Sequence, residues 1–240
     1  MTALYLVRHA QASFGTHDYD RLSPRGREQA RLMGQYFAHA TPQLHALHCG
    51  EMQRHRETAQ AVIDARRAAG LGELAIATDA RLNELDVAGQ FQHLIPRIPD
   101  ADGTLVALRE QSRTSSSAYQ QLLRRVYRHW QELTEPVADL ESWDAFARRV
   151  CAAVEAVAQH TPPGGRAIIV TSGGVIAAIA QQLLALPREE AYPLFEVLRN
   201  CSVSQLLHDR RRLSIATYNE CSYLQLFEQL HGIEGLVTHR

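Results

Sequence analysis

The sequence predicts an α/β fold, a three-layer α/β/α sandwich built around a mostly parallel central sheet. Short apolar segments alternate with amphipathic helical segments early in the chain, as in a parallel sheet joined by helices. The segment Leu4–Val7 is apolar at every position, which is typical of a strand covered on both faces. A second such strand, Ala167–Thr171, is rich in β-branched residues and runs directly into a glycine-rich helix start.

The elements after the first strand follow from local start and stop signals. Ser23 is a helix N-cap and Pro24 suits the first helical position, so a helix is expected over residues 24–40. A strand over 44–49, a helix over 53–69 and a short strand over 74–78 come next. This alternation predicts strands that share one sheet, with helices on both of its faces.

The alternation stops between residues 88 and 140. Prolines, a glycine and a run of serine and threonine precede a single amphipathic helix, expected over 118–133. The stretch is too short and polar for a core of its own, so it is interpreted as a largely helical lid insertion within one domain of residues 1–240. Beyond it the sequence predicts a helix over 142–160, the strand 167–171, a helix over 175–186 and a hairpin of strands 204–208 and 213–218.

Composition narrows the function classes. The formal net charge of −1 supplies no basic field for nucleic acid or for a membrane surface, so neither partner is expected. All 25 basic residues are arginine, which excludes Schiff-base lysine chemistry and a Walker A lysine. The four cysteines are far apart, and no segment has the pattern of a signal peptide or a membrane span, which favours a reduced, cytoplasmic protein. No histidine spacing typical of a metal site occurs, so neither a metal nor a cofactor is expected.

Arg8 and His9 stand where chemistry is expected in such a fold. Ligand sites of parallel sheets lie at the carboxyl ends of strands, and these two residues end the first strand. A guanidinium can hold phosphate oxygens while a neutral imidazole attacks phosphorus or moves a proton. The alternative is a structural histidine whose polar atoms are satisfied at the strand end.

Four segments, in their order along the chain, resemble the histidine phosphatase superfamily, in its phosphoglycerate-mutase-like group: Leu6–Gln11, Leu22–Ala30, Met52–Ala59 and Arg81–Leu85. The first is similar to an Arg-His-Gly signature with alanine in the glycine place. The third carries the family's second arginine and its downstream threonine, and the fourth is similar to the acidic segment. The likeness continues through residues 172–176 and 200–203, so it covers nearly the whole chain apart from the insertion.

The resemblance implies a mechanism through a covalent phosphohistidine. His9 would be the nucleophile, and Arg8 and Arg54 would bind the phosphoryl oxygens. Glu84 would protonate the leaving oxygen and later activate water. A solvated surface arginine at position 54 and a structural salt-bridge carboxylate at position 84 are the alternatives. His55 lies between two arginines and is expected to be exposed and incidental.

One departure from the family pattern matters most. Ser172 stands where the resemblance implies a second histidine. Its hydroxyl is a weaker, neutral donor, and loss of one donor to a developing anion costs about 10²–10³ in rate. The backbone N–H groups from Gly173 onward begin a helix, so a phosphate can still bind at its positive end. Turnover should rise in a Ser172→His variant.

Two functions agree with these features of the sequence. The first is a metal-independent phosphomonoesterase that acts through His9 and is slow because of Ser172. The alternative is a catalytically inactive member of the family that binds a phosphorylated ligand. A true phosphoglycerate mutase is disfavoured, because a small acidic sugar phosphate needs many charged contacts and the insertion has no lysine. The expected partner is a phosphorylated small molecule or a phosphoprotein, and the sequence leaves the oligomeric state open.

Overall fold

The computed structural model describes residues 1–13, 20–100 and 103–239. Within them, six strands form one sheet in the order β3-β2-β4-β1-β5-β6. The strands are β1 (Thr2–Arg8), β2 (Ala46–Cys49), β3 (Ile76–Thr78), β4 (Arg166–Thr171), β5 (Val203–His208) and β6 (Leu213–Glu220). The four strands from β3 to β1 are parallel, and β5 is antiparallel to both of its neighbours. The predicted mostly parallel sheet is confirmed, and the predicted C-terminal hairpin forms its edge.

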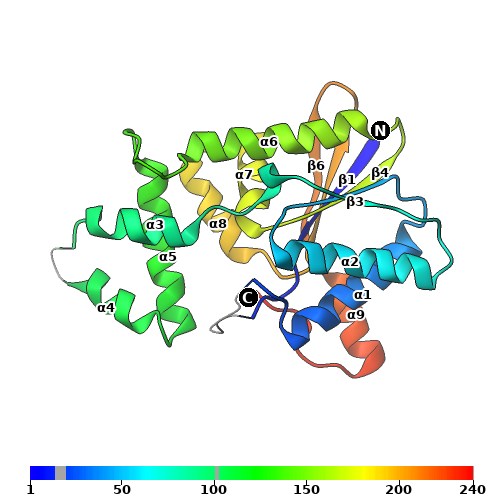
Figure 1. The fold of residues 1–240 in the computed structure, drawn as a ribbon, viewed down its shortest axis with the longest axis horizontal. Helices are drawn as coiled ribbons and strands as arrows, with labels where there is room; N and C mark the ends of the chain where they lie inside the picture. The colour runs from blue at the N-terminus through cyan, green and yellow to red at the C-terminus, as the bar shows by residue number, and fades with distance from the viewer. Residues whose placement is uncertain (14–19, 101–102, 240) are drawn as a thin grey trace.

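Helices cover both faces of this sheet, which confirms the three-layer sandwich (Figure 1). One face carries α1 (Pro24–Ala40), α2 (Gln53–Ala68) and α9 (Ser222–His231). The other carries α6 (Trp143–His160), α7 (Gly173–Leu183) and the short α8 (Ala191–Val197). Alternate residues of β1 serve the two layers: Leu4 and Leu6 join the α6–α7 cluster, and Val7 joins the α1–α2 cluster.

Local signals explain where the first helix begins. The Ser23 Oγ accepts from the backbone N–H of Gly26, as an N-cap does. Gly26 is necessary here because a Cβ at this position would lie 2.0 Å from the Gln11 carbonyl oxygen. The start of α1 is therefore held against the chain that leaves β1, next to His9.

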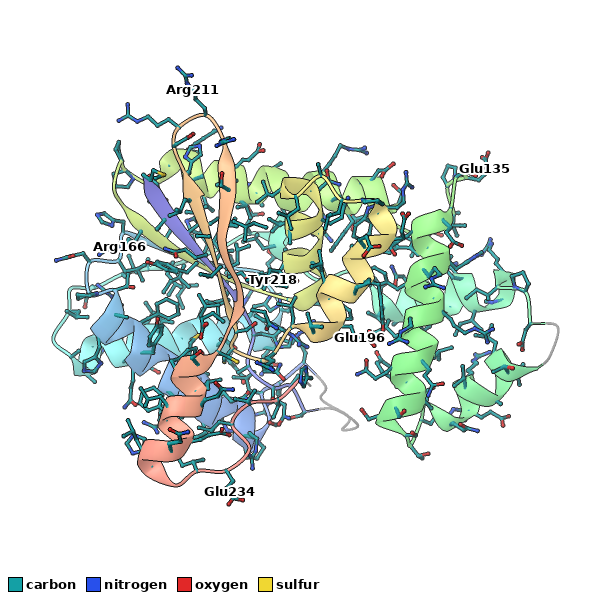
Figure 2. All side chains as sticks on the ribbon, turned by 180° about the vertical axis from the view of Figure 1, so that it is seen from behind. Glu135, Arg166, Glu196, Arg211, Tyr218 and Glu234 are labelled. Carbon is teal, nitrogen blue, oxygen red and sulfur yellow. The ribbon has the colours of Figure 1, made fainter. Side chains whose placement is uncertain are left out.

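The stretch from residue 88 to 140 holds more helix than the sequence suggested. It contains most of α3 (Val87–Leu94), all of α4 (Thr104–Gln111) and α5 (Ser116–Glu132), and the 3₁₀ turn Ile95–Arg97. Residues 101–102 of it lie outside the described part. These helices lie to one side of the sandwich beyond α8, in green in Figure 1. Glu196 on α8, labelled in Figure 2, forms an ion pair with Arg124 on α5.

The carboxyl ends of β1, β2 and β4 meet at one edge of the sheet, next to the start of α2 and of α7. Two further 3₁₀ turns, Ala80–Leu82 and Arg188–Glu190, complete the described elements. No helix among the described residues is both long and apolar enough to span a membrane.

Candidate active site

His9 follows β1 directly, and its hydrogen bonds determine where its proton lies. Its Nδ1 is 2.7 Å from the Ala10 carbonyl oxygen, which can only accept, so Nδ1 carries the hydrogen. The Nε of Arg54 lies 3.2 Å from Nε2 of the same ring and can only donate. The Nε2 atom therefore holds a lone pair, and this nitrogen is the nucleophilic one.

The surroundings of His9 also keep its ring neutral. The side chain is 7% exposed, and this burial lowers its pKa well below the usual value of 6.5. The nearby charges of Arg54 and Arg8, and the imidazole of His55, lower the pKa further. A neutral imidazole with an unprotonated Nε2 is the protonation state that attack on phosphorus requires.

Arg54 lies in the first turn of α2 and is 6% exposed, so it is not a surface arginine. Besides His9, its guanidinium contacts the carboxylate of Asp20 at 2.6 Å. Thr58, one turn later, fixes this end of the helix because its Oγ1 donates to the Arg54 carbonyl at 2.7 Å. The same oxygen accepts from the Ala10 N–H at 3.1 Å, which joins α2 to the residues after His9.

Arg8 ends β1 and is 6% exposed. Its Nη1 donates to two carbonyl oxygens, those of Leu198 at 2.5 Å and His239 at 2.8 Å. Asn200 is buried beside it and donates from Nδ2 to the His9 carbonyl at 3.2 Å. The Arg8 side chain and the His9 backbone are therefore held by residues much later in the sequence, at positions 198, 200 and 239.

Glu84 is brought to the start of α7 by the turn that follows β3. Its Oε2 accepts from the Gly174 N–H at 3.0 Å, and its Oε1 accepts from the Leu85 N–H at 3.1 Å. A Cβ at Gly174 would lie 2.3 Å from Oε1, so glycine here lets the carboxylate keep this position. Two backbone N–H groups, one of them at the start of α7, therefore fix the position of the Glu84 carboxyl group.

Ser172 and Gly173 join β4 to α7 and are fully or almost fully buried. The Ser172 side chain does not cap its helix, and its Oγ lies 2.6 Å from Nε2 of His55. Neither residue lines the cavity described below, whereas Arg8, His9, Arg54 and Glu84 all do. The structure thus brings the predicted residues to one edge of the sheet, with Ser172 behind the cavity wall.

The expectation that His55 is exposed is wrong. Its side chain is 0% exposed, and its ring lies beside that of His9, with the two ring centroids 5.6 Å apart. The reason is its place on the buried stripe of α2, which also contains Thr58, Ala59 and Val62. That helical spacing was visible in the sequence and outweighs the two flanking arginines.

A cavity of about 640 Å³ opens above His9. Among the described residues, its only cationic lining side chains are those of Arg8 and Arg54. The opposite wall is apolar and comes from the inserted helices and α8, chiefly from Val87, Phe91, Tyr119, Leu123 and Phe195. The cavity thus has a charged floor and an apolar wall.

This geometry agrees with a comparison of the sequence with protein families. The model of the histidine phosphatase superfamily (branch 1) matches residues 4–135 and 107–221. The chain belongs to this superfamily. No curated protein matches the chain closely enough to be informative.

Solved structures with the histidine phosphatase fold resemble the chain over most of its length. Bacillus stearothermophilus YhfR is 21% identical, with a TM-score of 0.66, over 93% of this chain and 100% of its own. A phosphoserine phosphatase from Entamoeba histolytica, in complex with 3-phosphoglyceric acid, is 14% identical with a TM-score of 0.63, over 93% and 100%. A mycobacterial glucosyl-3-phosphoglycerate phosphatase is 21% identical with a TM-score of 0.58, over 90% and 98%. At these identities the likeness establishes the fold alone.

Proposed function

We propose that this protein hydrolyses phosphate monoesters, with Nε2 of His9 as the nucleophile. The observation that carries the proposal is the hydrogen-bonding state of that ring, whose hydrogen is on Nδ1 and whose lone pair faces Arg54. Arg54 and Arg8 supply charge for the phosphoryl oxygens, and such electrostatic stabilisation is the main requirement of phosphoryl transfer. These two guanidinium groups are already in place to stabilise the negative charge of the phosphoryl group during the reaction.

The reaction proceeds in two steps that leave the enzyme unchanged. Nε2 of His9 forms a bond to phosphorus, the bond from phosphorus to the ester oxygen breaks, and Glu84 gives that oxygen its proton. Glu84 then takes a proton from water, whose oxygen attacks phosphorus and breaks the bond to His9. Inorganic phosphate and a neutral His9 result, with Glu84 protonated for the next turnover.

We expect turnover to be slow. A neutral Ser172 hydroxyl supports the phosphoryl group less strongly than a protonated imidazole would at the same position. The competing function, an inactive protein that binds a phosphorylated ligand, rests on the same feature, the serine at position 172 in place of a histidine. The two differ in whether His9 ever carries a phosphoryl group.

The cavity favours a phosphorylated small molecule whose alcohol is apolar or aromatic. Its volume of about 640 Å³ suits such a ligand. Arg8 and Arg54 are both engaged by the phosphate, so no lining cation among the described residues is left for a carboxylate on the substrate. Phe91 and Tyr119, whose ring centroids are 5.7 Å apart, instead offer an aromatic wall.

The test is a comparison of 1-naphthyl phosphate with phosphoserine and 3-phosphoglycerate. We expect a higher kcat/KM for the naphthyl ester, and a phosphorylated protein in quenched samples that is absent in His9→Ala. In Phe91→Ala the KM for the naphthyl ester should rise, with the KM for phosphoserine little changed. A protein that binds inorganic phosphate yet shows no adduct and no turnover would be the inactive binder.

A further inference from the structure

The buried pair formed by Ser172 and His55 contains one polar hydrogen that finds no acceptor. The pair holds two polar hydrogens, the Ser172 hydroxyl hydrogen and the single N–H of a neutral His55. The contact between Oγ and Nε2 uses one of them. Among the described residues, Nδ1 of His55 has no hydrogen-bond partner, and Ser172 Oγ has no partner besides His55. One buried hydrogen of this pair therefore lacks an acceptor.

Either tautomer of His55 leaves one hydrogen over. With the ring hydrogen on Nδ1, the Ser172 hydroxyl donates to Nε2, and the Nδ1–H, which faces Gly50, has no acceptor. With the ring hydrogen on Nε2, the ring donates to Oγ, and the hydrogen left over is that of the Ser172 hydroxyl, which can rotate. Burial and the charge of Arg54 keep the pKa of His55 well below its usual value, so the ring has no second hydrogen. Only the tautomer with hydrogen on Nε2 offers a donor that can turn toward a bound phosphoryl group.

The strand register places Ser172 beside His9. Arg8 pairs with Thr171 across β1 and β4, and the His9 N–H donates to the Thr171 carbonyl at 2.8 Å. Ser172 follows Thr171 as His9 follows Arg8, so the two side chains leave neighbouring parallel strands at the same level. The ring of His55 lies against both of them.

The backbone is shaped to admit an imidazole at this position. A Cβ on Gly50 would lie 2.3 Å from Nδ1 of His55, so the carboxyl end of β2 leaves room for the ring only because residue 50 is glycine. An apolar ring would fill the same volume without the cost of burying an unpaired nitrogen. The choice of histidine therefore points to its hydrogen-bonding ability rather than to its volume.

We propose that the Ser172 hydroxyl donates its hydrogen to an oxygen of the phosphoryl group on His9, and that His55 is the positioning residue that orients this hydroxyl. The inference rests on the proposed function, and it gives the neutral donor at position 172 a partner supplied by α2. In this arrangement the His55 imidazole does not touch the phosphoryl group but acts on it through Ser172 Oγ. Without Ser172 the donor is absent, and without His55 the hydroxyl is free to turn away.

Three variants separate this role from simple packing. His55→Phe keeps a ring of similar volume and lacks the donor, whereas His55→Gln keeps an N–H at about the reach of Nε2 and lacks the ring. Ser172→Ala removes the hydroxyl itself. We expect kcat on 1-naphthyl phosphate to fall about 10- to 1000-fold in His55→Phe and in Ser172→Ala, with KM changed less. His55→Gln should retain most of the activity.

The double variant His55→Phe with Ser172→Ala should be no slower than the poorer single variant, since both changes remove one donor. His39→Phe, on the exposed end of α1, is the matched control and should behave as the unaltered protein. Thermal unfolding of each variant shows whether the fold is kept. If His55→Phe is as fast as the unaltered protein and His55→Gln is slow, packing explains the ring and the proposal is overturned.

Binding of inorganic phosphate, measured by calorimetry, keeps this test separate from that of the proposed function. If the unaltered protein has no turnover and forms no adduct, the proposed hydrolysis fails. Phosphate should then still bind more weakly to Ser172→Ala and His55→Phe than to His39→Phe. Equal phosphate affinity in all of these variants, or no phosphate binding to any, overturns the role of the pair. In nitrogen NMR, the Nε2–H signal of His55 should be seen in the unaltered protein and shift when phosphate binds.

Discussion

Nε of Arg54 lies 3.2 Å from Nε2 of His9, so the group that would hold the phosphoryl oxygens also points at the atom that would attack phosphorus. A guanidinium has several N–H groups in one plane, so its donation can pass from the ring nitrogen to the oxygens of an arriving phosphoryl group. A lysine ammonium at this position would offer a single point of charge. The side-chain geometry of Arg54 therefore matters as much as its charge.

The first prediction concerns this geometry. Arg54→Lys keeps the positive charge but loses the planar set of donors, and we expect kcat to fall by at least about 100-fold. Arg67→Lys, on the same helix but 73% exposed, is the control and should leave kcat unchanged. Steady-state kinetics on 1-naphthyl phosphate checks both. Retention of full activity in Arg54→Lys would show that only the charge is needed.

The second prediction concerns stability against pH. Burial holds the pKa of both His9 and His55 well below 6.5 in the folded protein, whereas both return to about that value on unfolding. Below pH 6.5 the unfolded chain binds protons that the folded protein does not, so the stability that is complete above this pH is lost as the pH falls. Each histidine adds up to about 1.4 kcal/mol per pH unit to this dependence.

We therefore expect the melting temperature to fall between about pH 7 and pH 5, and to fall less steeply in His55→Phe, which lacks one of the two groups. The measurement is a series of calorimetric scans, with His39→Phe as the control for loss of an exposed histidine. Parallel curves for His55→Phe and the unaltered protein would contradict the assignment of His55 as a buried neutral ring.

The third prediction revises the outcome expected from sequence for Ser172→His. Ser172 is 0% exposed and in contact with His55, so a second imidazole at position 172 has no free volume and should overpack the site. We expect the single variant to be less stable and no faster. In the double variant Ser172→His with His55→Ala the volume is available, and kcat should exceed that of His55→Ala alone by about tenfold or more. A gain in the single variant with unchanged stability would show that the site has room for both rings.

The fourth prediction separates the role of Glu84 from phosphate binding. In Gly174→Ala the added Cβ would lie 2.3 Å from Oε1 of Glu84, so the carboxylate must shift from its position. Proton transfer to the leaving oxygen should suffer, and kcat should fall about 100-fold, while calorimetry shows inorganic phosphate still bound. Gly72→Ala, where an added Cβ meets nothing within 4 Å, controls for the change of residue type. Full activity in Gly174→Ala would argue that Glu84 is not the acid.

Local signals predicted the parts of the fold that local interactions determine. Helix α1 has the predicted bounds because the Ser23 cap and Pro24 set its start through contacts with adjacent residues. Strand β6 extends beyond the predicted Tyr218 to Glu220, because its length is set by pairing with β5 rather than by its own residues. Helices α3, α4, α8 and α9 were not predicted, since three of them span only seven or eight residues and depend on tertiary packing.

In the candidate site, too, the residues placed by local patterns could be predicted and those placed by tertiary packing could not. Arg8 and His9 could be placed because they end an apolar strand, and Arg54 because a recognisable motif surrounds it. The pairing of His55 with Ser172 depends on how α2 packs against the end of β4, which no local pattern describes. The contact of Arg54 with Asp20 likewise joins segments that are distant in sequence. Such contacts become visible only when the helices are placed on the sheet.

The guanidinium of Arg8 is held by the carbonyl of His239, and Thr238 donates to the side chain of Asn200, which itself supports His9. Residues at the end of β1 are thus fixed by residues more than 190 positions later in the sequence. A shortened variant that lacks positions 238 and 239 would keep every proposed catalytic side chain but lose contacts that orient two of them. The precision of the site is therefore set by residues that take no part in the proposed chemistry.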